Sequence, residues 1–262
     1  MKQIRNIFTP LTNINSRISM LLIAVNVVLA LFVWQTYSTG GLIPTPFKVS
    51  ESLVKTITSA SFVDNLFSSL VLTIKGMFIS IVMALIICYL SLIPLFSPLA
   101  KFIMKCRYLT LTGLIFLFTL LTDNGHSLKM SLLVFGIVPF FVTSFLSIIG
   151  DIKEEEYNLC KTLRMNNWES LLEVVIIGKL DQVIEVIRQN FAIAWMMITM
   201  VEGLCMSEGG LGTMLIKSNK YIDLGSVFSV LLIILVIGIL FDLLLKKVRE
   251  MFFPYTKIQL KK

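Results

Sequence analysis

Residues able to carry catalytic or metal chemistry are few in this chain. The single histidine, His126, lies in a short Asp-Asn-Gly-His sequence, and the four cysteines (Cys88, Cys106, Cys160, Cys205) have unrelated spacings. A zinc site needs grouped Cys, His or carboxylate ligands, and nucleophilic catalysis needs a base beside the nucleophile. The sequence shows neither grouping. We therefore expect no metal and no catalytic residue, and we interpret His126 as part of a polar turn.

Nucleotide chemistry is not expected of this chain either. The sequence contains no G-x-x-x-x-G-K-[ST] loop, so ATP binding by that route is excluded and any energy source must lie on another subunit. The net charge of +7 does not require nucleic acid, because the basic residues flank apolar stretches, where anionic lipid headgroups favour them. We expect membrane lipid as a partner, no nucleic acid and no cofactor.

The remaining ionisable candidates lie in or beside apolar stretches. Glu202 ends one such stretch, and an ionisable group in a spanning helix is a functional-site hypothesis by default; the alternative is a carboxylate solvated at the outer surface. Lys75 borders an uncharged run, and we expect it to extend toward the outer headgroups rather than to contact a substrate. Asp242 and Lys246, at i and i+4, are expected to form a structural ion pair.

Membrane helices must position these residues. Apolar residues make up 56% of the 262 and charged residues 15%, which does not suit a soluble domain. Lipid cannot satisfy backbone polar groups, and long uncharged runs favour helices over a barrel. Each crossing takes about 20 residues. We predict one domain, 1–262, with six spans at 18–37, 71–96, 102–122, 129–149, 183–205 and 224–245.

The distribution of basic residues predicts the orientation. Most of the 23 Lys and Arg residues fall on one side if the N-terminus is cytoplasmic, which places both termini in the cytosol. The first apolar run is too long for a typical signal peptide, so we interpret it as a retained anchor. In the first outer loop, Thr45 followed by Pro46 predicts the start of a short surface helix that extends through Ile57.

A charged segment, residues 151–189, separates the fourth and fifth spans on the cytoplasmic side. Leu159 and Leu163 are one helical turn apart, and Asn166 with Glu169 forms a capping-box pattern at the start of a second helix. We predict a helix, a turn and another helix, serving either as a docking element or as a solvated or membrane-surface linker. The second apolar stripe comprises Trp168, Leu171, Leu172, Val175 and Ile176.

The order of these features resembles the permease subunits of bacterial ABC importers, in particular those of the nitrate, sulfonate and taurine type. The resemblance covers most of the chain, from Leu42-Ile43-Pro44-Thr45-Pro46 to Pro254. The residues that carry it are Thr162-Leu163 through Trp168, Val174-Val175, Leu180, Ala194-Trp195, Val201-Glu202, Gly210-Leu211-Gly212 and Asp242.

The resemblance implies an all-α protein with six transmembrane helices, like a type I ABC importer permease, in the bacterial inner membrane. It implies a second permease copy, cytoplasmic ATPase subunits that dock on a coupling segment at 151–180, and an extracytoplasmic substrate-binding protein. The implied coupling residues are Asn158, Leu159, Leu163, Arg164, Asn166, Trp168 and Leu172. The implied residues of the translocation pathway or outer gate are Glu202, Gly210 and Gly212.

The coupling segment also departs from the family pattern. The Glu-Ala-Ala of the family is replaced by Asn158, Leu159 and Cys160, its Gly by Arg164 and its two Pro residues by Ile177 and Asp181. Gly and Pro most readily permit a sharp turn, although Asn also tolerates turns and caps helices. The alternative interpretation is a membrane scaffold or receptor-like subunit that kept the fold and uses the altered segment for another partner. The outer glycines are expected to form a gate-like loop or a plain turn.

Overall fold

Helices make up all the regular structure of the described part of the chain. The computed structural model describes residues 16–38 and 43–254, and no strand occurs within these ranges. The all-α prediction is confirmed. The helices long and apolar enough to cross a membrane are α2 (Ser16–Ser38), α4 (Ala60–Leu90), α7 (Gly125–Gly150), α10 (Leu180–Leu204) and α12 (Leu224–Phe252).

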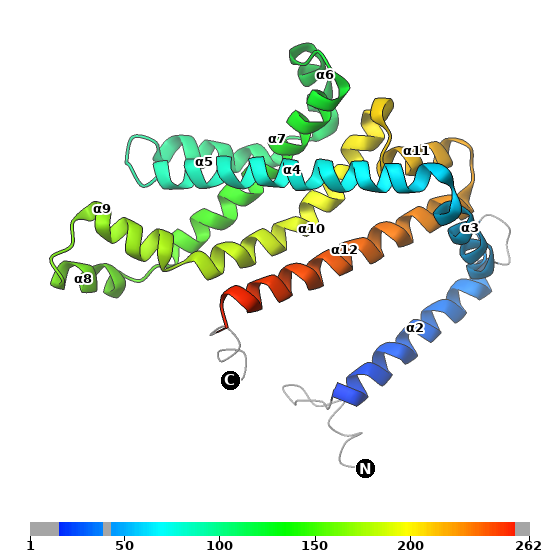
Figure 1. Cartoon of the computed structure of the whole chain (residues 1–262), viewed down its shortest axis with the longest axis horizontal. Helices are drawn as coiled ribbons and strands as arrows, with labels where there is room; N and C mark the ends of the chain where they lie inside the picture. Colours follow the sequence, from blue (N-terminus) through cyan, green and yellow to red (C-terminus); the bar gives the residue numbers. More distant parts are fainter. Residues whose placement is uncertain (1–15, 39–42, 255–262) are drawn as a thin grey trace.

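Helix α7 lies at the centre of the bundle and packs against both α4 and α10 (Figure 1). Leu133, Ile137 and Phe141 of α7 are fully buried, and they meet the α4 and α10 side chains Ala84 and Ile198 in one apolar core. The α10 helix also packs against α12, which forms the far side of the bundle. This core fixes the relative positions of the helices whose ends carry the candidate residues.

The α2 helix lies apart from the bundle. Its most apolar stretch has no buried residue, and Figure 1 shows it diverging from α12 toward its N-terminal end. Near its other end, the Trp34 indole Nε1 donates to the Pro44 carbonyl at 3.1 Å, and its ring lies 5.6 Å from that of Phe228. The exposed faces of α2 are therefore open to lipid or to another protein.

The helix predicted over 102–122 is interrupted. Helix α5 (Ser97–Lys105) and the short η1 (Cys106–Tyr108) are followed by α6 (Leu111–Leu121), with a bend of 113° between the two parts. Leu109 and Thr110 are extended at the break. The charged Lys105 and Arg107 separate the two apolar halves. Helix α6 alone is about 16 Å long at 1.5 Å per residue, too short for the ~30 Å hydrocarbon core.

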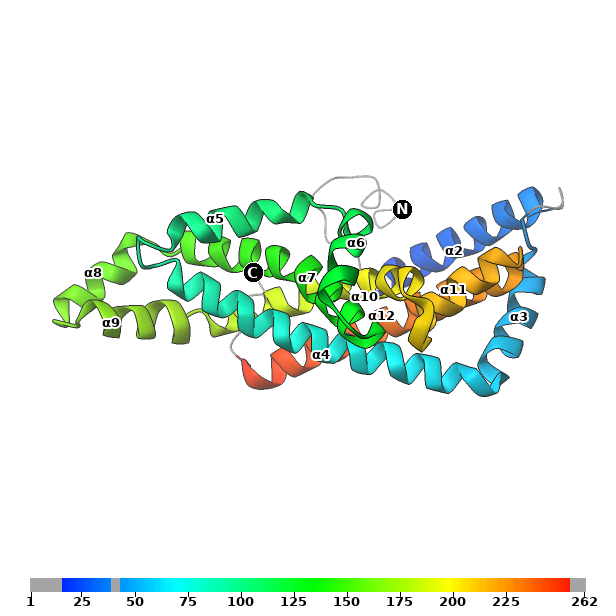
Figure 2. The ribbon, with the colours of Figure 1, turned by 90° about the horizontal axis from the view of Figure 1, so that it is seen from above.

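Short helices cap the two ends of the bundle. Helix α3 (Pro46–Thr58) begins as predicted: Pro46 is its first residue, and the Thr45 side chain accepts from the Lys48 N–H at 3.3 Å. It packs on α12, which also contacts α11 (Leu211–Lys220), the helix that follows η3 (Met206–Glu208), at one end of the molecule. At the opposite end lie α8 (Glu154–Thr162), α9 (Asn167–Ser170) and η2 (Leu171–Ile177), as Figures 1 and 2 both show.

Candidate functional site

The candidate residues fall into two groups at opposite ends of the bundle. One is the helix pair, defined here as α8, α9 and η2 at residues 154–177. The other is the glycine loop, residues 209–212, with the side chains that hold it. Helix α10 begins just after the helix pair and ends just before the glycine loop. A single helix therefore connects the two sites.

The α8 helix ends in a Schellman motif centred on Arg164. The Met165 N–H donates to the Cys160 carbonyl at 3.1 Å and the Arg164 N–H donates to the Lys161 carbonyl at 3.0 Å. Arg164 has φ +55°, the left-handed conformation that this motif usually gives to glycine. A non-glycine residue pays about 1–2 kcal/mol for this conformation. The turn is therefore made at Arg164 without a glycine.

The second helix of the pair starts with the capping box that the sequence predicted. The Asn166 side-chain oxygen accepts from the Asn167 N–H at 2.7 Å, and the Glu169 carboxylate accepts from the Asn166 N–H at 2.7 Å. These bonds satisfy backbone donors that a helix start leaves free. Asn166 thus fixes the direction of the chain after the turn.

The helix pair continues as a π-helix, which the sequence did not indicate. Over Leu171–Ile177 the chain makes wider turns, closed by the Gly178 N–H donating to the Glu173 carbonyl at 2.9 Å. A side chain at Gly178 would lie 2.8 Å from the Val174 carbonyl oxygen, so this position needs glycine. π-helical turns are rare and often occur at functional sites. The chain thus turns toward α10 at Gly178, next to Ile177.

One face of the helix pair is anchored to the bundle. Cys160, Val174 and Val175 are buried in a small cluster with Tyr89 and other residues at the end of α4. Burial raises the pKa of Tyr157 in α8. The Lys179 ammonium, at the junction with α10, pairs with the Glu156 carboxylate of α8 at 2.9 Å. The pair is therefore held as one body on the adjacent ends of α4, α7 and α10.

The other face carries an exposed ridge of apolar side chains. Leu159, Leu163 and Trp168 are 62%, 66% and 67% exposed, and Leu172 is 48% exposed. We define these four as the exposed ridge. The stripe predicted from the sequence is split, because Val175 is buried against α4 while Trp168 and Leu172 face outward. Asn158, Arg164 and Asn166 are also exposed beside the ridge.

The glycine loop is held by a buried carboxylate. Glu202 is fully buried, and its carboxylate accepts from the Ser69 hydroxyl at 2.7 Å and from the Gly212 N–H at 2.9 Å. Ser69 in turn accepts from the Leu211 N–H at 2.9 Å. The solvated alternative for Glu202 is therefore wrong: the residue lies between α4, α10 and α11 and orders the start of α11.

Glycine is required at two loop positions. Gly210 has φ +112°, and a side chain there would overlap the Glu202 carboxylate. A side chain at Gly212 would overlap the backbone carbonyl of Thr199 on α10. The close backbone approach expected for this loop is thus present.

A second buried charge, Lys129, was not among the residues that the sequence singled out. It is 1% exposed, and its ammonium donates to the Gly209 carbonyl at 3.0 Å. It also acts electrostatically on Glu202. The available signal was its place one turn inside α7, directly before the uncharged run that begins at Met130. His126, by contrast, is exposed and lies 3.2 Å from a Glu208 carboxylate oxygen, and no group of metal-binding side chains occurs among the described residues.

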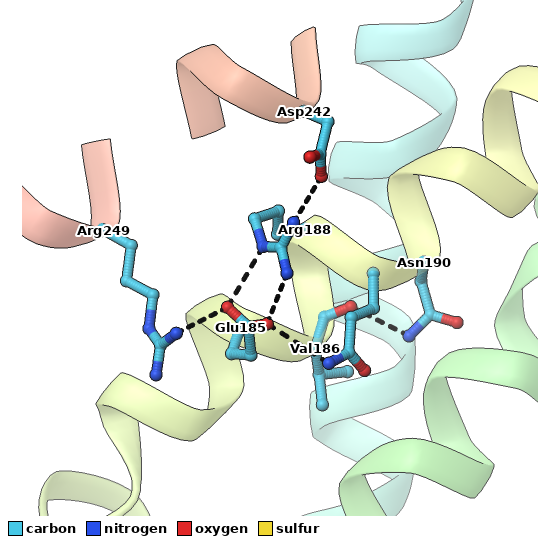
Figure 3. A network of polar contacts seen from close by, with 7 residues as sticks. Glu185, Val186, Arg188, Asn190, Asp242 and Arg249 are labelled. Atoms are coloured by element: carbon cyan, nitrogen blue, oxygen red, sulfur yellow. Dashed lines mark hydrogen bonds and ion pairs between the residues drawn. The ribbon is translucent and has the colours of Figure 1, made fainter. Parts of the chain in front are cut away.

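A charge network joins the N-terminal half of α10 to the C-terminal half of α12 (Figure 3). The Arg188 guanidinium donates to Glu185 at 2.6 and 3.1 Å and pairs with Asp242 of α12, while Arg249 of α12 reaches Glu185 at 2.7 Å. The expected Asp242–Lys246 pair is therefore wrong. Packing of α10 on α12 gives the half-exposed Asp242 a partner across the helix contact, as ionisable residues in spanning helices usually have.

Lys75 also lies elsewhere than the sequence suggested. The helix begins at Ala60, so this exposed lysine stands in the middle of α4 rather than at its start.

Comparison with known proteins agrees with this arrangement. Residues 54–250 match the family described as binding-protein-dependent transport system inner membrane component. A crystal structure of an amino acid ABC transporter with histidines is similar to the chain at a TM-score of 0.59 and 18% identity, covering 73% of this chain and 92% of that one. No curated protein matches the sequence. The family match includes both the helix pair and the glycine loop.

Proposed function

Since this chain belongs to the family of binding-protein-dependent transport system inner membrane components, and is thus a permease component of an ABC transporter, we propose that it couples to a separate ATPase subunit through the helix pair. Two copies of the chain would form the translocation pathway of an importer. An extracytoplasmic binding protein would deliver the substrate at the end that carries α3 and α11. In this arrangement ATP hydrolysis belongs to the partner.

The exposed ridge carries this proposal. It projects four large apolar side chains from a body that is anchored by Val174, Val175 and the Glu156–Lys179 pair. An amphipathic helix of this kind binds a partner by placing its apolar face in a groove. A rigid anchor behind the ridge lets the partner displace it as a unit rather than bend it.

The path from the ridge into the bundle also supports the proposal. The π turn leads directly into α10, and Arg188 of α10 binds Asp242 of α12. A displacement of the helix pair would therefore move α10 and α12 together. At its far end α10 carries Glu202, which holds Gly212. We propose that this connection lets the ATPase control the glycine loop as an outer gate.

The membrane placement proposed for the chain keeps the helix pair and both termini in the cytosol of a bacterium, with α2, α4, α7, α10, α12 and the bent α5–α6 segment as the six spans. Most of the terminal basic residues that favour this orientation lie outside the described residues. The Leu-Pro-Thr-Pro-like entry, Leu42 included, lies partly outside them too. We retain the nitrate, sulfonate and taurine type as the proposed subgroup, supported by the sequence pattern alone.

The experiment that tests the proposal replaces Trp168 and Leu172 with Glu. Charges in the ridge should prevent docking, because an unpaired carboxylate would have to enter an apolar groove. The tagged variant is expected to stay in the membrane and to lose the ATPase that co-purifies with the unmodified chain. Leu95→Glu is the matched control, since Leu95 is 78% exposed but lies outside the ridge.

Unchanged co-purification and unchanged ATP turnover in the double variant would contradict docking through the helix pair. If instead no ATPase co-purified with the unmodified chain, that would favour the scaffold or receptor-like alternative.

A further inference from the structure

We propose that Arg164 is a specificity-determining contact, pairing with an Asp or Glu side chain in an otherwise apolar groove of the ATPase subunit. The inference rests on the proposed function but goes beyond it, because it states which charge the partner must carry and where. The carboxylate would lie opposite the turn between α8 and α9. An ATPase whose groove lacks it would bind this chain poorly.

The backbone of Arg164 is the first observation. The residue occupies the left-handed position of a Schellman motif, with φ +55°, where glycine is favoured because it has no side chain to crowd the backbone. A long cationic side chain at this position makes the turn less stable than glycine would. No interaction within the described chain offsets that cost, because the exposed Arg164 side chain has no hydrogen bond or ion pair there.

The neighbouring carboxylates are the second observation. Glu169 is engaged by the backbone N–H of Asn166 at 2.7 Å, and Glu156 by the ammonium of Lys179 at 2.9 Å. Glu156 is the nearest acidic residue before the turn and Glu169 the nearest after it. Both carboxylates are thus engaged in contacts that stabilise the helix pair. The guanidinium of Arg164 is left available to a group outside the chain.

The position of Arg164 in the ridge is the third observation. Leu163 precedes it and is 66% exposed, and Trp168 follows after the turn and is 67% exposed. A cation set between two exposed apolar side chains loses water when the ridge docks, so it needs a charged partner. Guanidinium pairs with carboxylate in a planar two-bond geometry, and Arg and Trp are enriched among the residues that dominate interfaces.

A membrane surface fits this face less well than a protein groove does. Glu154, Glu155 and Glu173 are exposed on the same helix pair. Anionic lipid headgroups would repel these carboxylates, which outnumber the two exposed cations of the helix pair, Lys161 and Arg164. A protein groove can instead offer one carboxylate to Arg164 and leave the acidic start of α8 in water.

The test measures the affinity of the full permease for its ATPase as a function of NaCl concentration. The ATPase is the protein with a G-x-x-x-x-G-K-[ST] motif that co-purifies with the tagged chain, then prepared separately. Arg164→Gly is expected to weaken binding about tenfold, the loss typical of an interface residue that matters, and to flatten the salt dependence. The affinity of Arg164→Lys for the ATPase should lie between those of the unmodified chain and Arg164→Gly, and Arg164→Glu should bind most weakly.

Two controls separate the charge from the backbone. Arg164→Gly relieves the left-handed backbone, so its thermal unfolding temperature should not fall, and weaker binding cannot then be ascribed to misfolding. Ile222 is a second non-glycine residue in this conformation, with φ +56°, in the motif that ends α11 at the other end of the molecule. Ile222→Gly should relieve that turn and leave the affinity for the ATPase unchanged.

The inference is overturned if Arg164→Gly binds the ATPase with unmodified affinity and salt dependence. It is also overturned if the effect of the variant appears only with anionic lipid present, because Arg164 would then contact the membrane. Trp168→Glu distinguishes failure of the inference from failure of the proposed function. If Trp168→Glu loses binding and Arg164→Gly does not, only the proposed arginine contact is refuted. If Trp168→Glu binds fully, docking through the ridge is refuted.

Discussion

Two buried charges, Glu202 and Lys129, hold the glycine loop from opposite sides. Glu202 binds the Gly212 N–H and Lys129 binds the Gly209 carbonyl. Charges are expensive in a low-dielectric interior unless they are paired and hydrogen-bonded, and each of these has hydrogen-bonding partners and the opposite charge nearby. The loop position therefore depends on both side chains.

We predict that Lys129→Met and Glu202→Gln are strongly coupled. Lys129→Met should destabilise the protein by about 1–3 kcal/mol, because it removes a buried hydrogen bond and leaves Glu202 without a nearby cation. The double variant should lose less stability than the sum of the two single variants. Thermal unfolding in detergent measures this cycle. Additive losses would show that the two charges act independently.

Glu202→Gln should also change transport or its pH dependence, because the side chain keeps an acceptor for Gly212 but can no longer change charge. Substrate uptake into proteoliposomes, measured across a pH series, checks this prediction. Uptake equal to that of the unmodified protein at every pH would assign Glu202 a purely structural role.

Gly212→Ala tests the close approach of the loop to α10. The added methyl group would meet the Thr199 backbone carbonyl, which cannot rotate away, so a loss of about 1–3 kcal/mol is expected. Gly150→Ala is the control, because no atom lies within 4 Å of the corresponding position. Equal unfolding temperatures for the two variants would contradict the close contact.

Sequence reasoning located Glu202 and the glycines because their types are unusual beside an apolar run. It did not locate Lys129, because burial of a lysine at the end of a span depends on which backbone carbonyl lies opposite. That carbonyl belongs to Gly209, 80 positions away in the chain.

At the scale of elements, the sequence predicted those helix starts that are determined by hydrogen bonds between residues close in the chain. The Thr45–Pro46 start of α3 and the Asn166–Glu169 capping box are both present. The π turn was not predictable, since wide and ordinary turns share one apolar pattern and the choice depends on packing against α4. The span predicted over 102–122 contained the charged residues Lys105 and Arg107. The break between α5 and α6 lies just after them, so their charge was a signal that the prediction did not use.

The α10–α12 charge network yields a prediction at this scale. Arg188→Met should lower stability more than Asp242→Asn, by about 1 kcal/mol, because Arg188 joins Glu185 as well as Asp242. Both variants should reduce the transport obtained per ATP hydrolysed by the complex. Equal destabilisation by the two substitutions would show that the Glu185 contact contributes nothing.

At the scale of the molecule, the helix pair that carries the exposed ridge and the glycine loop lie at opposite ends of the helix bundle (Figure 1). The helices of this bundle share one apolar core. This separation suits a permease, because energy enters at one membrane face and substrate at the other. The all-α fold could be predicted from the composition. The separation of α2 from the bundle could not, because an apolar helix can pack equally well against a partner or against its own chain.

The proposed orientation predicts which side of the membrane each end occupies. Leu159→Cys should react with a membrane-impermeant thiol reagent only from the cytoplasmic side, and Tyr221→Cys, 84% exposed in the unmodified chain, only from outside. A background without Cys106 avoids labelling of that partly exposed thiol. Reaction of both variants from the same side would contradict the topology.

The central claim is that the exposed ridge contacts the ATPase, and a photo-crosslinking residue at position 163 tests it most directly. Leu163 is 66% exposed and lies at the turn of the helix pair. In intact cells the probe is predicted to form a covalent adduct with a protein that carries the phosphate-binding motif of an ATPase, while the same probe at Leu95 forms none. Adducts with lipid alone from position 163, or the same ATPase adduct from both positions, would contradict the account.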